Sequence, residues 1–113
     1  MPCVHEFGII RNFSEKNIKS YAEYEPEKYN CISVHDDDIA PVMRKLTDID
    51  TINPCIPENY KGLCHYGITV IPDISCGKFA DILEAEKNSA FYELTRLLRS
   101  AADSHNYVIH YGI

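Results

Sequence analysis

The residues of this chain best suited to metal or acid–base chemistry lie in three copies of one short phrase. The copies are Glu6-Phe7-Gly8-Ile9, His65-Tyr66-Gly67-Ile68 and His110-Tyr111-Gly112-Ile113. Each copy lies in an apolar, β-prone run, and aligning them on aromatic-Gly-Ile places Glu6, His65 and His110 at one position. Because side chains alternate across a strand, we expect these three on one sheet face and the aromatic and isoleucine side chains on the other.

Two imidazoles and one carboxylate form a donor set that suits Fe(II), Zn or Mn and leaves coordination positions open. The three residues are far apart in the sequence, however, and no local ligand motif such as HExxH accompanies them. The alternative is that Glu6, His65 and His110 are solvated residues on an open sheet face. The sequence thus makes them candidate binding residues without predicting a metal or any other cofactor.

A thiol and an imidazole could form a nucleophilic pair at Cys3 and His5, which share one face of a strand. Cys64 and His65 are adjacent and should point to opposite faces. The chain has five cysteines, an odd number, with no CxxC pair. This pattern is typical of reduced, mostly buried thiols rather than of a disulfide framework or a zinc ribbon, and we predict no catalytic cysteine.

Three consecutive aspartates, Asp36, Asp37 and Asp38, precede the clearest amphipathic helix pattern in the chain. Carboxylates are favoured at a helix N-terminus, where free N–H groups and the helix dipole attract negative charge. The calcium-loop pattern is absent here, because the turn glycine and the terminal glutamate are missing. We therefore interpret the aspartates as a helix cap.

A second functional hint is a tyrosine-rich, acidic segment that contains Tyr21, Tyr24 and Tyr29. Tyrosine gives contact area at small entropic cost, and carboxylates complement a basic surface, so an exposed loop of this composition suits protein binding. The alternative is that the tyrosines pack over the sheet. We list these three tyrosines as predicted binding residues.

Length and composition narrow the function classes. The 113 residues suit one domain, residues 1–113, and the net charge of −6 disfavours nucleic acid and favours a basic partner. No basic leader and no apolar stretch long enough to span a bilayer is present in the sequence. We expect a cytoplasmic protein that does not contact membranes.

The hydrophobic pattern predicts strands over residues 3–10, 31–34, 63–71 and 107–113. Helices are predicted from residue 14 to about 21, from the aspartates to residue 49, and from about residue 73 to 101 with a break at Asn88 and Ser89. Residues 50–61 contain two prolines and are expected to form a loop.

This element order predicts an α+β two-layer sandwich, with about four strands and two or three helices on one face. The preferred function is a small acidic binding protein that neutralises a basic partner, as immunity proteins do; this is an analogy of size, charge and surface. The alternative is a small enzyme or ligand- or metal-binding domain that uses Glu6, His65 and His110. Convergence of these side chains would distinguish the two.

Overall fold

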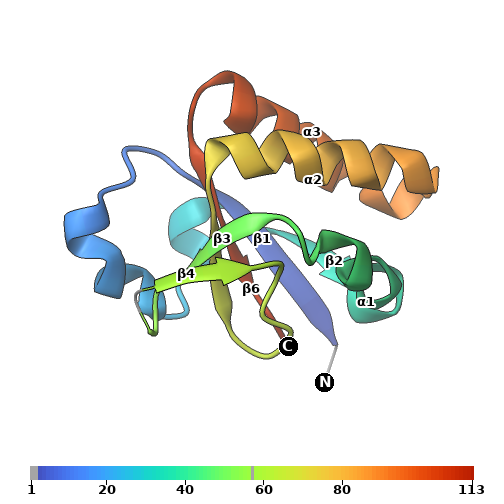
Figure 1. The fold of residues 1–113 in the computed structure, drawn as a ribbon. Coiled ribbons are helices and arrows are strands. Elements are labelled where there is room, and N and C mark those ends of the chain that lie inside the picture. Colours follow the sequence, from blue (N-terminus) through green and yellow to red (C-terminus); the bar gives the residue numbers. More distant parts are fainter. Residues whose placement is uncertain (1–2, 57) are drawn as a thin grey trace.

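A computed structural model describes residues 3–56 and 58–113. Its described residues form one antiparallel sheet of six strands in the order β2-β1-β6-β5-β3-β4 (Figure 1). The strands are β1 Val4–Ile10, β2 Ile32–His35, β3 Asp50–Asn53, β4 Glu58–Lys61, β5 Ile68–Ile71 and β6 Tyr107–Tyr111. The α+β class is confirmed, and the sheet is larger than the four strands expected.

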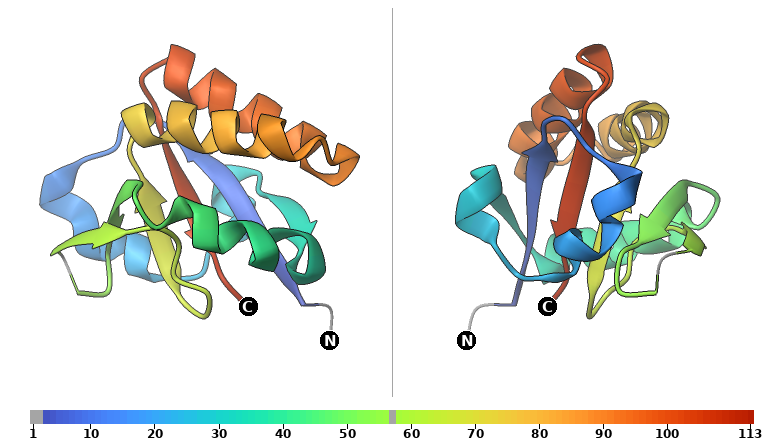
Figure 2. Two further views of the ribbon diagram at one scale, coloured as in Figure 1. Left: turned by 45° about the vertical axis from the view of Figure 1, so that its right-hand side comes forward. Right: turned by 90° about the vertical axis from the view of Figure 1, so that its left-hand side faces the viewer.

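Among the described residues, three α-helices cover one face of the sheet, which we call the α face. They are α1 Asp36–Met43, α2 Asp73–Glu86 and α3 Tyr92–Asp103. Both views in Figure 2 show α2 and α3 packed together across the strands. The predicted break between the last two helices is confirmed, since the Asn88 side chain accepts a hydrogen bond from the Ala90 N–H and caps the short 3₁₀ helix η4, Ser89–Phe91.

The main core lies between these helices and the sheet. Side chains from β1, β2, β5 and β6 meet the apolar stripes of all three helices, as the helical spacing requires. Its buried members include Phe7, Val34, Ile39, Val42, Leu46, Ile71, Phe79, Leu83, Phe91, Leu94, Leu98 and Val108.

The opposite face of the sheet is covered by two short 3₁₀ segments, and we call it the 3₁₀ face. These segments are η1 Glu15–Ala22 and η2 Pro26–Tyr29. They enclose a smaller cluster whose buried members are Ile10, Tyr21, Val70, Ile109 and Tyr111. The expectation of a sheet with one open face is therefore wrong, because residues 15–29 lie over it.

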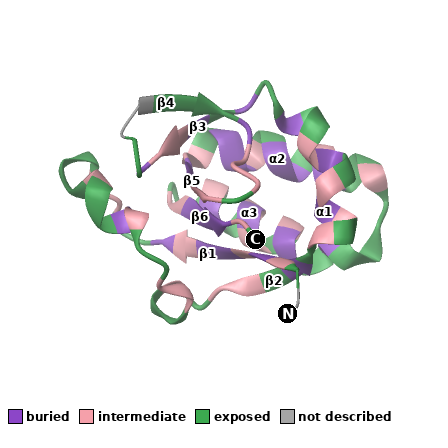
Figure 3. Cartoon of the chain, turned by 90° about the horizontal axis from the view of Figure 1, so that it is seen from below, coloured by how far each residue is buried: buried purple, intermediate pink, exposed green. Residues whose placement is uncertain are grey.

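Two expected elements differ from the structure. Residues 50–61 form the antiparallel pair β3 and β4 rather than a loop, with the turn stabilised by Asn53, whose side chain accepts hydrogen bonds from the Cys55 and Ile56 N–H groups. Pro54 lies in the turn, where it interrupts no strand, and Pro57 lies outside the described residues. The exposed strand β4 ends the sheet (Figure 3).

The strand predicted over residues 63–71 is shorter than expected. Only β5, Ile68–Ile71, is extended and paired, whereas Leu63 to Gly67 form a loop. The Cys64 N–H donates to the Thr69 hydroxyl at 2.8 Å, which folds this loop back on the strand. As a result, His65 lies on a loop at the end of the sheet, beside the start of β1 and the end of β6.

Candidate metal centre

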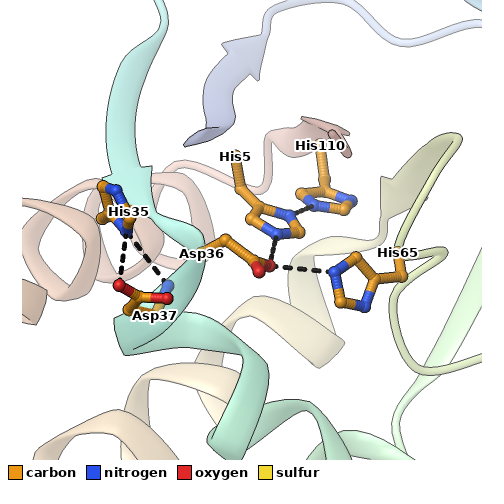
Figure 4. A network of polar contacts seen from close by, with 6 residues as sticks. All are labelled: His5, His35, Asp36, Asp37, His65 and His110. Atoms are coloured by element: carbon orange, nitrogen blue, oxygen red, sulfur yellow. Dashed lines mark hydrogen bonds and ion pairs between the residues drawn. The ribbon is translucent and has the colours of Figure 1, made fainter. Parts of the chain in front are cut away.

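Four polar side chains meet on the α face, at the end of the sheet where β1 begins and β6 ends (Figure 4). His5 comes from β1, Asp36 is the first residue of α1, His65 lies on the loop before β5, and His110 comes from β6. We refer to these four as the histidine cluster.

His5 is the central member of the cluster, and its side chain is fully buried. Its Nδ1 lies 2.8 Å from Nε2 of His110, and its Nε2 lies 2.7 Å from Oδ1 of Asp36. The His5 and His110 rings are stacked with centroids 5.1 Å apart. Both ring nitrogens of His5 therefore have a partner, and the ring is held from two sides.

The strand register explains why His5 and His110 meet. β1 and β6 are antiparallel, with Phe7 opposite His110 and Glu6 opposite Tyr111. Directly opposite residues point to the same face, so His110 shares the α face with Phe7 and His5. Their rings also contact one another, with the Phe7 and His110 centroids 4.9 Å apart.

Asp36 reaches the cluster because the start of α1 is tied to the start of β1. The Asp36 N–H donates to the Cys3 carbonyl at 2.8 Å. The cap of α1 is His35, whose Nδ1 accepts from the Asp37 N–H. All three aspartates do lie in the first turn of α1, as expected, but the carboxylate of Asp36 is turned toward histidines rather than used as the cap.

His65 completes the cluster from the more exposed side. Its Nε2 lies 2.9 Å from Oδ1 of Asp36, within ion-pair distance, but the orientation is not that of a hydrogen bond. This nitrogen and Nδ1 of His110 are buried and have no hydrogen-bond partner among the described residues. The loop itself is anchored, since the Ile113 N–H donates to the His65 carbonyl at 3.0 Å.

The surroundings favour the neutral forms of His5 and His110 and the ionised form of Asp36. Burial lowers the pKa of His5, although the nearby Asp36 opposes this, and burial lowers the pKa of His110 well below its usual value, with further lowering by His5 and His65. The hydrogen bond from His5 lowers the pKa of Asp36, and His65 lowers it further. Neutral imidazoles beside a carboxylate are the protonation states that a metal ion requires.

Three members of the cluster can contribute one ligand atom each to a single ion. The donor atoms of His5, Asp36 and His65 all lie within 4.8 Å of one another. Side-chain exposure is 32% for His65 and 20% for Asp36, so solvent reaches the outer side of this set. His110 lies behind His5 and contacts its second nitrogen instead.

The structure brings together two of the three sequence-predicted cluster residues. His65 and His110 lie in the cluster, but Glu6 faces the 3₁₀ side, where its carboxylate accepts a hydrogen bond from the Tyr24 hydroxyl. Convergence of Glu6 with the two histidines is therefore not observed. The alignment of the repeated phrase failed because pairing register, rather than local sequence, determines the face of each strand.

Sequence reasoning missed His5 and Asp36 as members of the same set. The sequence gives an indication for each residue. His5 lies two residues before Phe7 on one strand and therefore points to the same face, and Asp36 directly follows a short predicted strand. Placing them together required the pairing of β1 with β2, in which Val4 lies opposite His35.

The predicted binding tyrosines separate into two environments. Tyr21 is buried in the 3₁₀-face cluster, where it stacks on Phe13 with centroids 5.2 Å apart, and Tyr29 is half-buried against the same cluster. Tyr24 is 62% exposed. Of the three, only Tyr24 offers a large free aromatic surface.

Comparisons of the chain with protein-family models, with curated proteins and with solved structures find no match. None of the helices in the described ranges is long and apolar enough to cross a membrane. A hollow of about 960 Å³ between α2 and α3 includes no member of the histidine cluster. The chemistry of the cluster itself is thus the basis for a functional proposal.

Proposed function

We propose that this protein binds a divalent first-row transition metal through Nε2 of His5, Oδ1 of Asp36 and Nε2 of His65. The observation that carries the proposal is the convergence of these three donor atoms. Nε2 of His65 is buried, and its 2.9 Å contact with Oδ1 of Asp36 lacks the orientation of a hydrogen bond. Coordination to an ion would satisfy this nitrogen better than that contact does.

The distances fit an ion after a small local adjustment. Zinc bonds to histidine and carboxylate of about 2.0 Å imply donor atoms about 3.3 Å apart in a tetrahedral site. The distances from Oδ1 of Asp36 to His5 and His65, 2.7 and 2.9 Å, are shorter than this. Asp36 and His65 lie on the partly exposed side, so movement of these two side chains can supply the difference while His5 stays fixed in the sheet.

His110 supports the proposed site from behind. When Nε2 of His5 binds an ion, its Nδ1 carries the proton and donates to Nε2 of His110, 2.8 Å away. Such an outer hydrogen bond orients the ligating ring and makes it more basic. We expect His110→Gln to retain the site with roughly 10- to 100-fold weaker metal affinity.

Three protein ligands leave at least one coordination position for water or substrate, which is typical of catalytic rather than structural zinc sites. An ion here would lower the pKa of bound water or polarise a substrate oxygen. A metal-dependent hydrolytic role is the reaction class that this arrangement supports best. Asp36 and His65 form the solvent-facing side, where a substrate would approach.

Calorimetric titration of chelator-treated protein with Zn²⁺ tests the proposal. We expect one ion per chain, a visible absorption spectrum of tetrahedral type with Co²⁺, and loss of both in Asp36→Asn and His65→Ala. His105→Ala is the matched control, because the His105 side chain is 84% exposed and forms its ion-pair contact with Asp73, outside the histidine cluster. Equal binding by wild type and His65→Ala, or no binding by wild type, would reject the site.

An acidic binding protein is the second candidate, and the surface around Tyr24 favours it. Tyr24 is exposed beside the Glu6 carboxylate, and the chain carries a net charge of −6. A basic partner would be attracted to such a surface, and its association rate would fall as salt is added. Capture of the partner by wild type but not by Tyr24→Ala tests this role.

A further inference from the structure

A separate hollow of about 340 Å³ lies next to the last residues of the chain. Its lining residues are Tyr24, Tyr66, Gly67, Ile68, Tyr111 and Gly112. Ligand pockets begin at about 300 Å³, so this hollow suits a small group rather than a large molecule. Five of its six lining residues come from the second and third copies of the repeated phrase.

Pairing between the copies builds the floor of the hollow. Ile68 lies opposite Tyr111, and the Gly112 N–H donates to the Gly67 carbonyl at 2.7 Å. A Cβ at Gly112 would lie 2.2 Å from the His65 carbonyl oxygen, so no larger residue fits there. The glycines thus allow two chain segments to approach closely and leave the space above them to the tyrosines.

The tyrosine rings are held at different angles around this floor. The rings of Tyr24 and Tyr111 meet edge to face at 4.9 Å and 79°. Tyr66 stacks on His65 at 4.6 Å, which supports one face of its ring. Tyr66 is nevertheless 78% exposed, so the wall of the hollow presents aromatic surface to solvent.

A negative charge lies beside the wall of the hollow. Glu6, opposite Tyr111 in the register, accepts a hydrogen bond from the Tyr24 hydroxyl, and this bond raises the pKa of Tyr24 to about 12. The phenol therefore stays protonated and keeps the carboxylate beside the ring. No lysine, arginine or histidine is among the lining residues.

We infer that this hollow binds an alkylammonium group, either of a small quaternary amine or of a cationic side chain on a partner. The negative faces of aromatic rings attract cations, and sets of such rings recognise methylated ammonium groups. The carboxylate of Glu6 adds attraction without closing the space. This inference requires no bound metal ion, although Tyr66 stacks on His65, one of the proposed ligands.

Titrations followed by NMR, with chelator present, compare choline with its neutral isostere, 3,3-dimethylbutan-1-ol. We expect millimolar binding of the cation, with shifts confined to the backbone around Gly67 and Gly112, and much weaker binding of the alcohol. Tyr66→Ala and Glu6→Gln should each weaken cation binding several-fold. Tyr66→Phe should retain it, because phenylalanine keeps the aromatic face.

Tyr92→Ala is the matched control, since Tyr92 is 66% exposed on α3 and does not line the hollow. Circular dichroism of each variant separates loss of binding from loss of fold. Equal affinity for cation and alcohol, or unchanged binding in Tyr66→Ala with its fold intact, would overturn the inference. So would the absence of any cation-dependent shift in the wild type.

A second arm distinguishes the two sources of the ammonium group. Peptides containing lysine or trimethyllysine are titrated against the same protein, beside free choline. Tighter binding of a peptide than of choline, lost in Tyr66→Ala, assigns the hollow to a partner's side chain. Equal or weaker peptide binding assigns it to a small amine.

Discussion

The two faces of the sheet are covered by different kinds of structure, and the two candidate sites follow this division. On the α face, three helices bury a large apolar cluster, and the histidine cluster lies at its end. On the 3₁₀ face, two short segments bury few side chains and leave Tyr24 exposed beside the hollow.

This difference affects what each face can do. A metal ion needs ligand atoms held within tenths of an ångström, and strand residues backed by helices provide this precision. His5 and the supporting His110 are fully buried in such surroundings, whereas the proposed ligand His65 reaches the site from a loop. An ammonium group needs aromatic surface and nearby charge rather than exact geometry, which the thinner 3₁₀ face supplies.

The largest expected effect comes from removing a core side chain on the α face. Phe79 is buried and contacts Phe7 edge to face, with centroids 6.0 Å apart. Phe79→Ala should lower the free energy of unfolding by about 3–5 kcal/mol, because it leaves a cavity that the helices cannot fill. Urea denaturation measures this, with the exposed Tyr92→Ala as control. A loss below about 1 kcal/mol would mean that this face is loosely packed.

The corresponding change on the 3₁₀ face should cost less. Tyr21→Ala removes a buried ring that stacks on Phe13, and we expect a loss of about 2 kcal/mol. Tyr24→Ala should cost less than about 0.5 kcal/mol, since its ring is mostly in solvent. The same denaturation experiment compares them. Similar losses for Tyr21→Ala and Phe79→Ala would contradict the difference between the faces.

A smaller effect concerns acidification of the metal-free protein. Folding lowers the pKa of His110. Below about pH 6.5 the unfolded chain therefore binds a proton that the folded chain does not, and the free energy of unfolding decreases as the pH is lowered. His5 acts in the same direction, and Asp36, whose pKa is also lowered, does so at more acidic pH. His65 also faces His110 and opposes the protonation of His110.

Denaturation between about pH 7 and pH 5 in the presence of chelator measures this slope, which is at most about 1.4 kcal/mol per pH unit for each proton. His110→Gln should reduce the slope, because glutamine can keep a hydrogen bond to His5 but does not titrate. The exposed Tyr92→Ala is the control. An equal slope in wild type and His110→Gln would show that His110 is not the group responsible.

The sequence predicted elements better than it predicted their pairing. The amphipathic helices and the break at Asn88 follow from spacing and capping, which are local properties. The β3–β4 pair was missed because Pro54 suggested a loop, whereas it lies in the turn between two short strands. The cover on the second face was foreseen only as the alternative in which the tyrosines pack over the sheet, because residues 15–29 have few other apolar side chains.

The candidate site was predicted in type but not in membership. Two histidines and a carboxylate were expected, and His65 was among them, but the carboxylate that lies beside His65 is Asp36, and the other histidine of this set is His5. The cause lies in antiparallel register: Glu6 is adjacent to His5 and therefore faces the opposite side. Local sequence cannot supply which strand lies beside which.

The smallest effect concerns the rates at which two cysteine thiols, one on each face, react with an alkylating reagent in the unmodified protein. All five cysteines are free, and denatured protein without reductant should therefore react with five equivalents of a thiol reagent. In the folded protein, burial raises the pKa of Cys76 to about 12 and that of Cys31 to about 11, so both form little reactive thiolate at neutral pH. Exposed Cys3 and Cys55 should react first.

The order in which Cys31 and Cys76 are alkylated then shows which face of the sheet opens more readily. Cys76 is fully buried in the α-face core, whereas Cys31 packs at the edge of the 3₁₀-face cluster and is only half-buried. Local opening of the 3₁₀ segments should expose Cys31 at a smaller free-energy cost than the opening that exposes Cys76. Mass spectrometry after timed alkylation should therefore detect modified Cys31 well before Cys76. The reverse order would mean that α2 separates from the sheet more readily than residues 15–29 do, and the proposed rigidity of the α face would be wrong.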